Sequence, residues 1–346
     1  MSIVGTVVGG VDTHSDTHVA AAVDHNGGLL GVESFPTDEL GCEELLGWLS
    51  GFGPVARMGV EGTGSYGAGL TRFLTASEIE VVEVDRPNRQ LRYRKGKSDP
   101  TDAVAAARAA LSGEASGRPR GRNGPMEQMR VLLVARRSAR RQRIQILNQL
   151  RHLVFTAPEP IRVRFKDRYK RGLITEAAAM RPRKGVDPVA FTTNTVIRNL
   201  ARRIQHLDHE TKETNQILAE LVAEVAPTLL ELHGVGPDGA ATLLVTAGDN
   251  PDRLRSETAW AHLCGVAPIP ASSGKITRHR LNRGGDRNAN AALYRIVITR
   301  MSNHQETRRY VTRRRAEGLT TGEIVRCLKR YVARQTYKHL PQQATG

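Results

Sequence analysis

The stretch IVGTVVGGVDTHSDTHVAAAVDHNGGLLGVESF, residues 3–35, decides how the chain begins to fold. Its apolar residues run together or alternate over 3–11, 17–23 and 29–35, a pattern typical of three β-strands. An Asn-Gly-Gly turn at 26–28 separates the second run from the third and favours a tight hairpin. The chain is therefore predicted to open with a three-stranded meander.

Helices and strands are expected to alternate after this meander. Their predicted ranges, from the spacing of apolar residues, are a helix at 40–49, a strand at 55–60, a helix at 65–76, a strand at 79–84 and a helix at 100–111. The resulting order is βββαβαβα, which predicts an α/β domain with a mixed sheet covered by helices. We interpret residues 1–115 as an RNase H-like (RuvC-like) domain.

The middle of the chain, residues 116–228, is predicted to be helical. A first long helix covers 126–155 and is rich in arginine, and a second carries an apolar seam that steps by threes and fours. The seam consists of Ile197, Leu200, Ile204, Leu207, Thr211, Thr214, Leu218, Leu221 and Val225. This spacing predicts a coiled-coil hairpin or a dimer arm. The stretch 156–194 lacks periodicity and is expected to be irregular.

The last part, residues 229–346, is predicted to be mostly α-helical, with helices near 240–247, 257–264, 288–301 and 321–337. Gly234 and Gly236 lie directly before the first of these helices. Such glycines can turn backbone N–H groups towards a phosphate at a helix N-terminus, as in a helix-hairpin-helix element. The alternative is a plain glycine-proline connection between two helices.

Charge is distributed very unevenly along the sequence. Residues 1–112 hold 9 Lys or Arg against 15 Asp or Glu, whereas the remainder holds 42 against 20, so a net −6 is followed by a net +22. This balance predicts a nucleic-acid partner, although an Arg-rich composition alone would give a similar total. Predicted nucleic-acid contacts are Gly234, Gly236, Arg136, Arg137, Arg140, Arg278 and Arg280.

With no apolar run of roughly 18 residues, a cytoplasmic protein without membrane contact is expected.

Four carboxylates are the candidate catalytic residues. Asp12 and Glu61 follow the first and fourth strands, and Asp99 and Asp102 share one face at the start of a helix. Singly, each has an ordinary explanation as a turn, a solvated strand end or a helix cap. In an RNase H-like sheet, however, these positions converge, and such a cluster predicts a site for Mg²⁺ or Mn²⁺. His14 and Asp16 are candidate helpers of this site, but turn roles are expected for both.

The sequence also resembles a known family, the insertion-sequence one-ten family of DEDD transposases. The resemblance rests on Gly-Val-Asp12-Thr-His, Val-Glu61-Gly-Thr-Gly, Lys97-Ser-Asp99-Pro-Thr-Asp102-Ala, Leu232-His-Gly-Val-Gly236, and Gly265-Val-Ala-Pro268 running into Ser272-Ser273-Gly274. It covers nearly the whole chain, and residues 229–346 then resemble the family's C-terminal transposase domain.

The resemblance implies a site-specific recombinase that moves a circular insertion sequence between donor and target DNA, directed by an element-encoded guide RNA. It also implies a nucleophilic serine that falls on Ser273, with Ser272 as the fallback. Separately, the apolar seam of residues 197–225 predicts self-association, and the expected homo-oligomer is a dimer or a tetramer on DNA. Two other functions stay open on the residues alone. A RuvC-like junction endonuclease would need the carboxylates but no serine, and a non-catalytic RNA- or DNA-binding protein would need only the basic helices.

Overall fold

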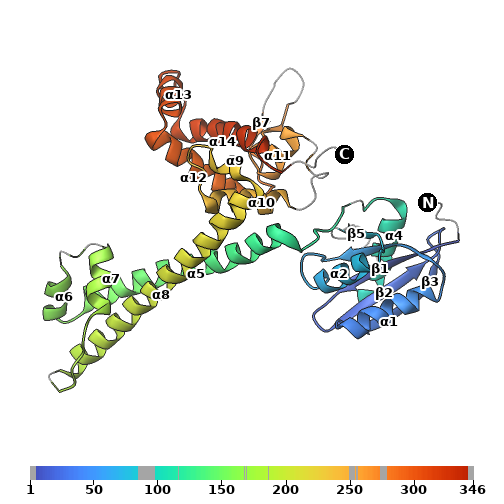
Figure 1. Cartoon of the computed structure of the whole chain (residues 1–346), viewed down its shortest axis with the longest axis horizontal. Coiled ribbons are helices and arrows are strands. Elements are labelled where there is room, and N and C mark those ends of the chain that lie inside the picture. Colours follow the sequence, from blue (N-terminus) through green and yellow to red (C-terminus); the bar gives the residue numbers. More distant parts are fainter. Residues whose placement is uncertain are drawn as a thin grey trace. The chain divides into compact units, whose positions relative to one another are not determined.

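A computed structural model describes residues 5–84, 98–115, 117–166, 168, 170–185, 187–248, 254, 256–272 and 279–341. The chain forms two compact units, Met1–Arg122 and Asn123–Gly346 (Figure 1). The second unit contains both the predicted helical middle and the predicted C-terminal domain. No helix in the described part of the chain is both long enough and apolar enough to span a lipid bilayer.

The first unit is built on a five-stranded sheet in the order β3-β2-β1-β4-β5. The strands are β1 (Val7–Thr13), β2 (Thr17–Val23), β3 (Leu29–Pro36), β4 (Val55–Glu61) and β5 (Val81–Val84). The first three pair antiparallel, and β4 runs parallel to both β1 and β5. The predicted meander and the mixed sheet are confirmed, and this arrangement fits an RNase H-like domain.

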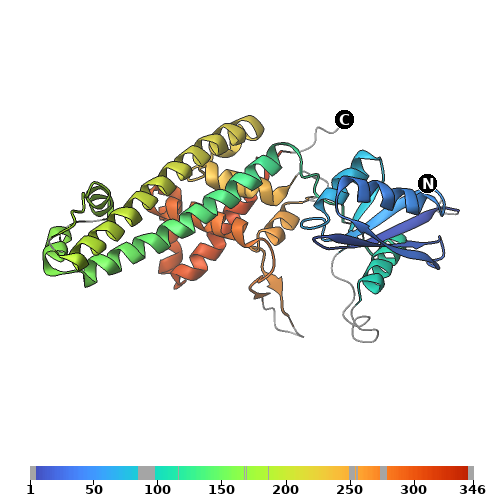
Figure 2. The ribbon, with the colours of Figure 1, turned by 90° about the horizontal axis from the view of Figure 1, so that it is seen from below.

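Helices cover both faces of this sheet (Figures 1 and 2). Helices α1 (Glu39–Ser50) and α2 (Ala68–Ala76) bury Leu45, Leu70 and other apolar side chains against one face. Helix α4 (Asp99–Ser112) packs its alanines against the other face, on β1, β2 and β4. All residues of β1 are buried, with odd positions such as Val7 and Val11 facing α1 and even positions such as Val8 facing α4.

The first strand begins and ends later than its apolar run predicted. It covers Val7–Thr13 rather than 3–11, and residues 1–4 lie outside the described residues. Its pairing with β2 continues through Asp12 opposite Val19 and Thr13 opposite His18, so hydrogen bonding in the sheet extends the strand. Asp12 is consequently a buried strand residue and not part of a turn.

The second unit opens with two long antiparallel helices, α5 (Gly124–Thr156) and α8 (Pro188–Val225), which lie side by side (Figures 1 and 2). The expectation of an irregular stretch at 156–194 was wrong. This stretch contains α6 (Glu159–Phe165) and α7 (Lys170–Ala178), and α8 already begins at Pro188. Buried apolar side chains of α6 and α7 pack into the same core as the two long helices, and this tertiary burial stabilises helices that are too short to show periodicity.

The apolar seam predicted in α8 is largely used inside the chain. Ile197, Ile204 and Leu218 are fully buried. Ile204 lies in one core with Leu147 and Leu150 of α5, and Leu218 lies in another with Met129 and Leu133 of α5. The two helices therefore form a hairpin within one chain.

The remaining helices pack around the fully buried Trp260 and the apolar helix α10. They are α9 (Pro227–Leu230), α10 (Pro237–Ala247), α11 (Glu257–Leu263), α12 (Arg287–Asn303), α13 (Gln305–Ala316) and α14 (Thr321–Tyr337), and a short hairpin of β6 (Ile269–Pro270) and β7 (His279–Arg280) interrupts them. The predicted helices in this part are confirmed. Helix α13 has no predicted counterpart, because five of its twelve residues are arginine and its few apolar residues show no helical period.

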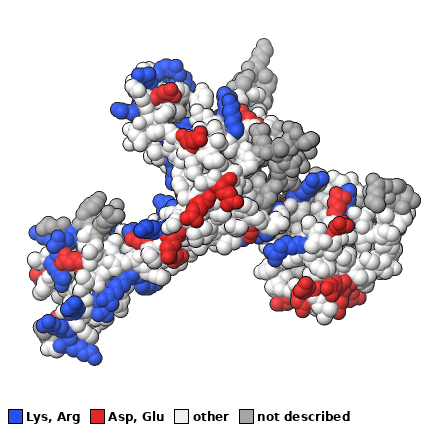
Figure 3. All heavy atoms as spheres, in the orientation of Figure 1, with Lys and Arg blue, Asp and Glu red and all other residues white. Residues whose placement is uncertain are grey.

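Surface charge differs between the units (Figure 3). In the first unit, acidic side chains gather over α1, where Asp38, Glu39, Glu43 and Glu44 are all exposed. In the second unit, basic side chains gather over α13 and over the end of the long hairpin that carries α6 and α7. The acidic and basic parts of the sequence therefore correspond to the first and second folded units.

Candidate metal centre

Two glycines allow helix α4 to lie directly on the sheet. A Cβ atom at Gly10 of β1 would lie 2.1 Å from the backbone nitrogen of Ala107, and one at Gly59 of β4 would lie 2.4 Å from the carbonyl oxygen of Ala106. Both distances are far below van der Waals contact, so only glycine permits this approach. The close contact fixes the position of α4 over the two neighbouring strands.

This packing brings the predicted carboxylates towards one another. Asp12 lies two residues beyond Gly10, and Glu61 lies two residues beyond Gly59, so both side chains share the α4 face of the sheet. Val11 pairs with Val60, which places Asp12 and Glu61 at neighbouring positions. Towards its N-terminus, α4 carries Asp102 and Asp99, one turn apart.

Asp99 would be the N-cap residue if helix α4 began at Pro100, but the helix begins one residue earlier. Its N-cap residue is Ser98, and Asp99 is the first helical residue. The Asp99 carboxylate therefore does not occupy the N-cap position, and one of its oxygens lies 3.5 Å from Nε2 of His14. The ordinary explanation of Asp99 as a helix cap is excluded by this geometry.

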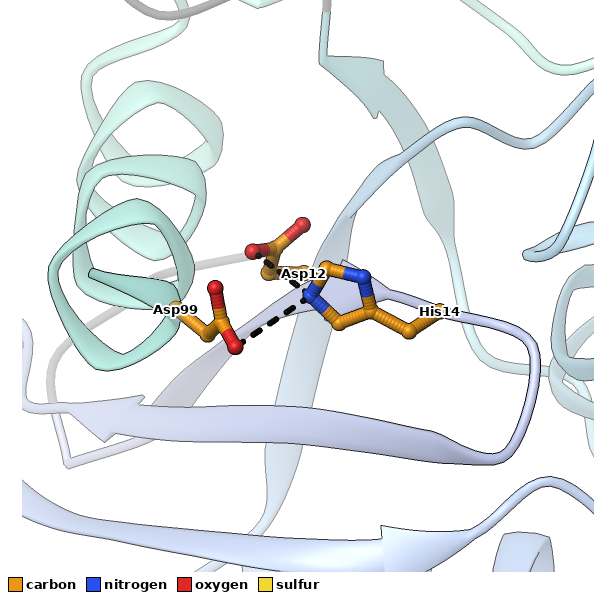
Figure 4. Close-up of side chains that lie close together, drawn as sticks. All are labelled: Asp12, His14 and Asp99. Atoms are coloured by element: carbon orange, nitrogen blue, oxygen red, sulfur yellow. Dashed lines mark ion pairs between the residues drawn. The ribbon is translucent and has the colours of Figure 1, made fainter. Parts of the chain in front are cut away.

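His14 joins two of the carboxylates (Figure 4). Its Nε2 atom lies 3.3 Å from a carboxylate oxygen of Asp12 and 3.5 Å from one of Asp99. One ligand atom from each of these three residues lies within 4.8 Å of the others. His14 lies in the turn between β1 and β2, as the sequence predicted, and from this turn its ring reaches both carboxylates. Its place directly after the strand that carries Asp12 is the signal that makes this contact possible.

Electrostatics at the centre favour a bound cation. Burial raises the pKa of Asp12, the charge of His14 opposes this rise, and the nearby carboxylates of Asp102 and Asp99 increase it. Asp12 and Asp102 are both buried, whereas the Asp99 side chain is about half exposed. A carboxylate whose neighbours repel its charge gains most from a positive ligand.

The donor set fits a divalent metal. Carboxylate oxygens suit Mg²⁺ and Mn²⁺, and an imidazole nitrogen is a ligand that Mn²⁺ and other transition metals accept more readily than Mg²⁺. Asp12, Asp99 and His14 would supply the three ligand atoms that already lie together. Glu61 is held beside them through its backbone, since its carbonyl oxygen accepts a 2.8 Å hydrogen bond from Oγ1 of Thr13.

The predicted nucleophile and one predicted arginine, Ser273 and Arg278, lie outside the described residues. Ser272 is described and exposed, two residues beyond β6, and Arg280 is exposed in β7. Gly234 has a positive φ of 78°, which favours glycine, and Gly236 is the N-cap residue of α10. The connection between α9 and α10 is thus a tight glycine turn.

The arginines predicted to bind nucleic acid on α5 have different environments. Arg136 is mostly buried, and its guanidinium donates to Asn215 at 2.6 Å and to Asp238 at 2.7 Å. Burial lowers its pKa, and the Asp238 carboxylate opposes this effect. Arg136 therefore joins α5 to α8 and α10, whereas Arg137 is half-buried and Arg140 is exposed. Of the three, Arg140 is the most accessible to a ligand.

Comparison with known proteins identifies the fold's family. The family model for DEDD transposases of the IS110 type matches residues 9–157, and the model for the transposase IS116/IS110/IS902 family matches residues 226–312. Together these matches cover about two thirds of the chain.

Two proteins of insertion elements are also similar. The insertion element IS110 uncharacterized 43.6 kDa protein of Streptomyces coelicolor is 33% identical over 138 residues, which is 39% of this chain and 34% of that protein. The insertion element IS900 uncharacterized 42 kDa protein of Mycobacterium paratuberculosis is 28% identical over 139 residues, which is 39% of this chain and 35% of that protein. The aligned part spans about a third of each relative. With both family models matching in order along one chain, the protein belongs to the IS110 family of DEDD transposases.

Proposed function

We propose that this protein is the transposase of an insertion sequence, which cuts and rejoins DNA with a divalent metal at Asp12, Glu61, Asp99 and Asp102 and with Ser273 as the nucleophile. The observation that carries this proposal is the close approach of α4 to β1 and β4 through Gly10 and Gly59, in a chain of this family. That contact supports the proposal, because β1, β4 and α4 each carry an acidic residue near it.

A bound Mg²⁺ or Mn²⁺ would supply charge neutralisation at the phosphate and activation of the attacking oxygen. The chain's own residues would hold it: Asp12 from the sheet, Asp99 and Asp102 from α4, and Glu61 from β4. His14 lies between Asp12 and Asp99 and would add a nitrogen ligand. Asp12 and Asp102 are buried, and burial restricts the positions that their carboxylates can take before DNA binds.

The covalent step is a displacement at phosphorus. The hydroxyl oxygen of Ser273 forms a bond to the phosphorus of the DNA backbone, and the bond from phosphorus to the leaving oxygen of the cut strand breaks. The serine proton is transferred to a base at the site, and the leaving oxygen takes up a proton. A phosphoserine keeps the energy of the phosphodiester for rejoining, since the reverse displacement by another DNA end releases the serine.

Donor and target DNA and a guide RNA are the partners proposed for the basic second unit. Exposed arginines such as Arg140 and Arg280 would contact phosphates, and the turn at Gly234 and Gly236 would act as a helix-hairpin-helix element with its N–H groups towards a phosphate. The hairpin of α5 and α8 would serve as a coiled-coil arm of a homo-oligomer. Its surface keeps an apolar groove of about 500 Å³ lined by Val131 and Ile217, among others.

A suicide DNA substrate that traps covalent intermediates tests the proposal. Wild-type protein should form a covalent adduct with the substrate when Mg²⁺ or Mn²⁺ is present. Ser273→Ala and Asp102→Asn should each lose the adduct, whereas Ser272→Ala, the matched control, should keep it. An adduct lost in Ser272→Ala and kept in Ser273→Ala would move the nucleophile by one residue. Cleavage without any adduct in wild type would refute the serine mechanism and leave a junction endonuclease that uses water.

A further inference from the structure

The second unit contains a cavity of about 920 Å³ that the metal centre and the glycine turn do not explain. Its walls come from α13, α14, the start of α12 and the two arms of chain at 265–268 and 279–283. These two arms flank the stretch that carries Ser273. The cavity is therefore close, along the chain, to the predicted nucleophile.

The lining of this cavity is strongly basic. Eight Lys or Arg side chains line it, and no Asp or Glu is found among its described lining residues. Several of the arginines form ion pairs with carboxylates that do not line the cavity. Arg330, for example, donates to a carboxylate oxygen of Glu257 at 3.1 Å. Lys329, Arg280 and Arg283, however, have no carboxylate within 4.0 Å in the described part of the chain. The cavity consequently holds positive charge that the described residues leave uncompensated.

Lys329 is the most informative of these cations. It is half-buried, and its ammonium group donates a 2.9 Å hydrogen bond to the side-chain oxygen of Asn290, a neutral acceptor. The Asn290 amide nitrogen in turn donates to the carbonyl oxygens of Cys264 and Gly265, at 3.0 and 3.1 Å. Asn290 is thus oriented by the backbone and holds Lys329 in place without neutralising it. Burial lowers the pKa of Lys329, and the charge of Arg326 lowers it further.

The same cavity also has apolar and aromatic walls. Tyr331 is half exposed, and its ring packs edge to face on Tyr310 at 5.8 Å between centroids. Val266, Pro268 and Leu281 add apolar surface on the opposite arms. A bare phosphate would use only the cations. A ligand with a phosphate and a flat apolar face would use both kinds of wall.

We propose that this cavity binds one nucleotide of a nucleic-acid strand, with its phosphate on Lys329 and its base against Tyr331. This inference rests on the proposed function, because Ser273, the proposed nucleophile, belongs to the stretch of sequence between the two arms that line the cavity. Lys329 would act by direct contact with the phosphate, and Asn290 would position Lys329. The free protein keeps the lysine charge half-buried and unpaired, and the bound phosphate neutralises it.

Fluorescence anisotropy of the full-length protein with short labelled single strands tests the inference, using DNA and RNA of one sequence in separate arms. Lys329→Gln should weaken binding on the order of tenfold and lower the salt slope by about 0.7, the value for one lost phosphate contact on a single strand. Lys212→Gln removes an exposed lysine of α8 and is the charge-matched control. Tyr331→Ala should also weaken binding on the order of tenfold, and Tyr331→Phe should retain it.

A second readout separates ligand binding from a structural role. Because Lys329 is charged, half-buried and unpaired with a carboxylate, Lys329→Gln should keep or raise the melting temperature of the free protein while it weakens binding. A lysine needed for folding would show the opposite, a lower melting temperature. A loss confined to the DNA arm would identify the bound strand as DNA, and a loss confined to the RNA arm would identify it as RNA.

Equal losses in Lys329→Gln and Lys212→Gln, or no loss in Lys329→Gln, would overturn the inference. These results are distinguishable from failure of the proposed function. An adduct absent from wild type would refute the serine mechanism even if Lys329 bound the strand, whereas an adduct formed normally by Lys329→Gln would refute the cavity's role alone.

Discussion

The two units hold uncompensated charge of opposite sign. In the first unit, carboxylates from β1 and α4 are brought together around one histidine, and their repulsion contributes to the raised pKa of Asp12. In the second unit, cations line a cavity without a carboxylate among its described lining residues, and burial lowers the pKa of Lys329. The proposals made above assign a cation to the first of these sites and a nucleic-acid phosphate to the second.

The two units build these charged sites in different ways. The first unit obtains its cluster from two glycines that let a helix approach a sheet. The second forms its cavity between helices. There Asn290 donates to a backbone carbonyl oxygen and accepts a hydrogen bond from Lys329. We therefore expect the carboxylate cluster to be disturbed by added side-chain volume under α4. The cavity should be more sensitive to a change of charge at Lys329.

The largest effect is expected in the core of the second unit. Leu218 of α8 is fully buried against α5, so Leu218→Asp should destabilise this unit by about 4 kcal/mol or more by burying a charge without a partner. Ile217→Asp, at the neighbouring and half-exposed position, should change stability by less than about 0.5 kcal/mol. Urea unfolding of both variants measures the difference.

The same pair of variants also sharpens the proposal of a homo-oligomer. Ile217 lines the apolar groove of the hairpin, so Ile217→Asp should lower the mass seen by light scattering if this groove joins two copies. An unchanged mass in a folded Ile217→Asp protein would remove the groove from any interface. A stable Leu218→Asp protein would contradict the packing of the hairpin itself.

A smaller effect is expected where α4 meets the sheet. The Cβ atom of Gly59→Ala would lie 2.4 Å from a backbone oxygen of α4, which should cost about 1–3 kcal/mol and displace Asp102. Gly69→Ala, in α2, would meet no atom within 4 Å and should be neutral or stabilising by up to about 1 kcal/mol. Chemical denaturation compares the two, and equal stabilities would show that α4 does not approach the sheet this closely.

The smallest effect is a pH dependence. A carboxyl with a raised pKa in the folded protein holds its proton more tightly than in the unfolded chain, so it contributes stability when protonated. For Asp12 this contribution is lost as pH rises from the ordinary pKa of aspartate through the raised value. Asp12→Asn should flatten the fall in melting temperature over this range, measured without added metal. A fall that is unchanged in Asp12→Asn would mean that other groups cause it.

The sequence predicted the sheet of the first unit well, because alternation and a glycine turn are local signals. Of the four predicted carboxylates, Asp12 and Asp99 lie together with His14, and a site completed by Glu61 and Asp102 stays a prediction. The sequence placed His14 in a turn, where the structure has it, but did not predict that the ring contacts Asp12 and Asp99.

Features that depend on distant contacts could not be predicted. Helices α6 and α7 are stabilised by burial against the long hairpin, and their short sequences carry no period. The cavity in the second unit joins Asn290 and Lys329 across 39 positions of sequence, with no motif to link them. The structural role of Arg136 likewise depends on Asp238, 102 positions away, so sequence alone read it as one more exposed arginine.

Titration of Mn²⁺ into the free protein, followed by isothermal calorimetry, tests the central claim that the first unit is built for a cation. Wild type should bind Mn²⁺, Asp12→Asn and Asp102→Asn should lose binding, and His14→Ala should weaken it about tenfold. Asp16→Asn removes an exposed carboxylate two residues from His14 and should bind as wild type does. Wild-type affinity in Asp12→Asn, or an equal loss in Asp16→Asn, would contradict the account.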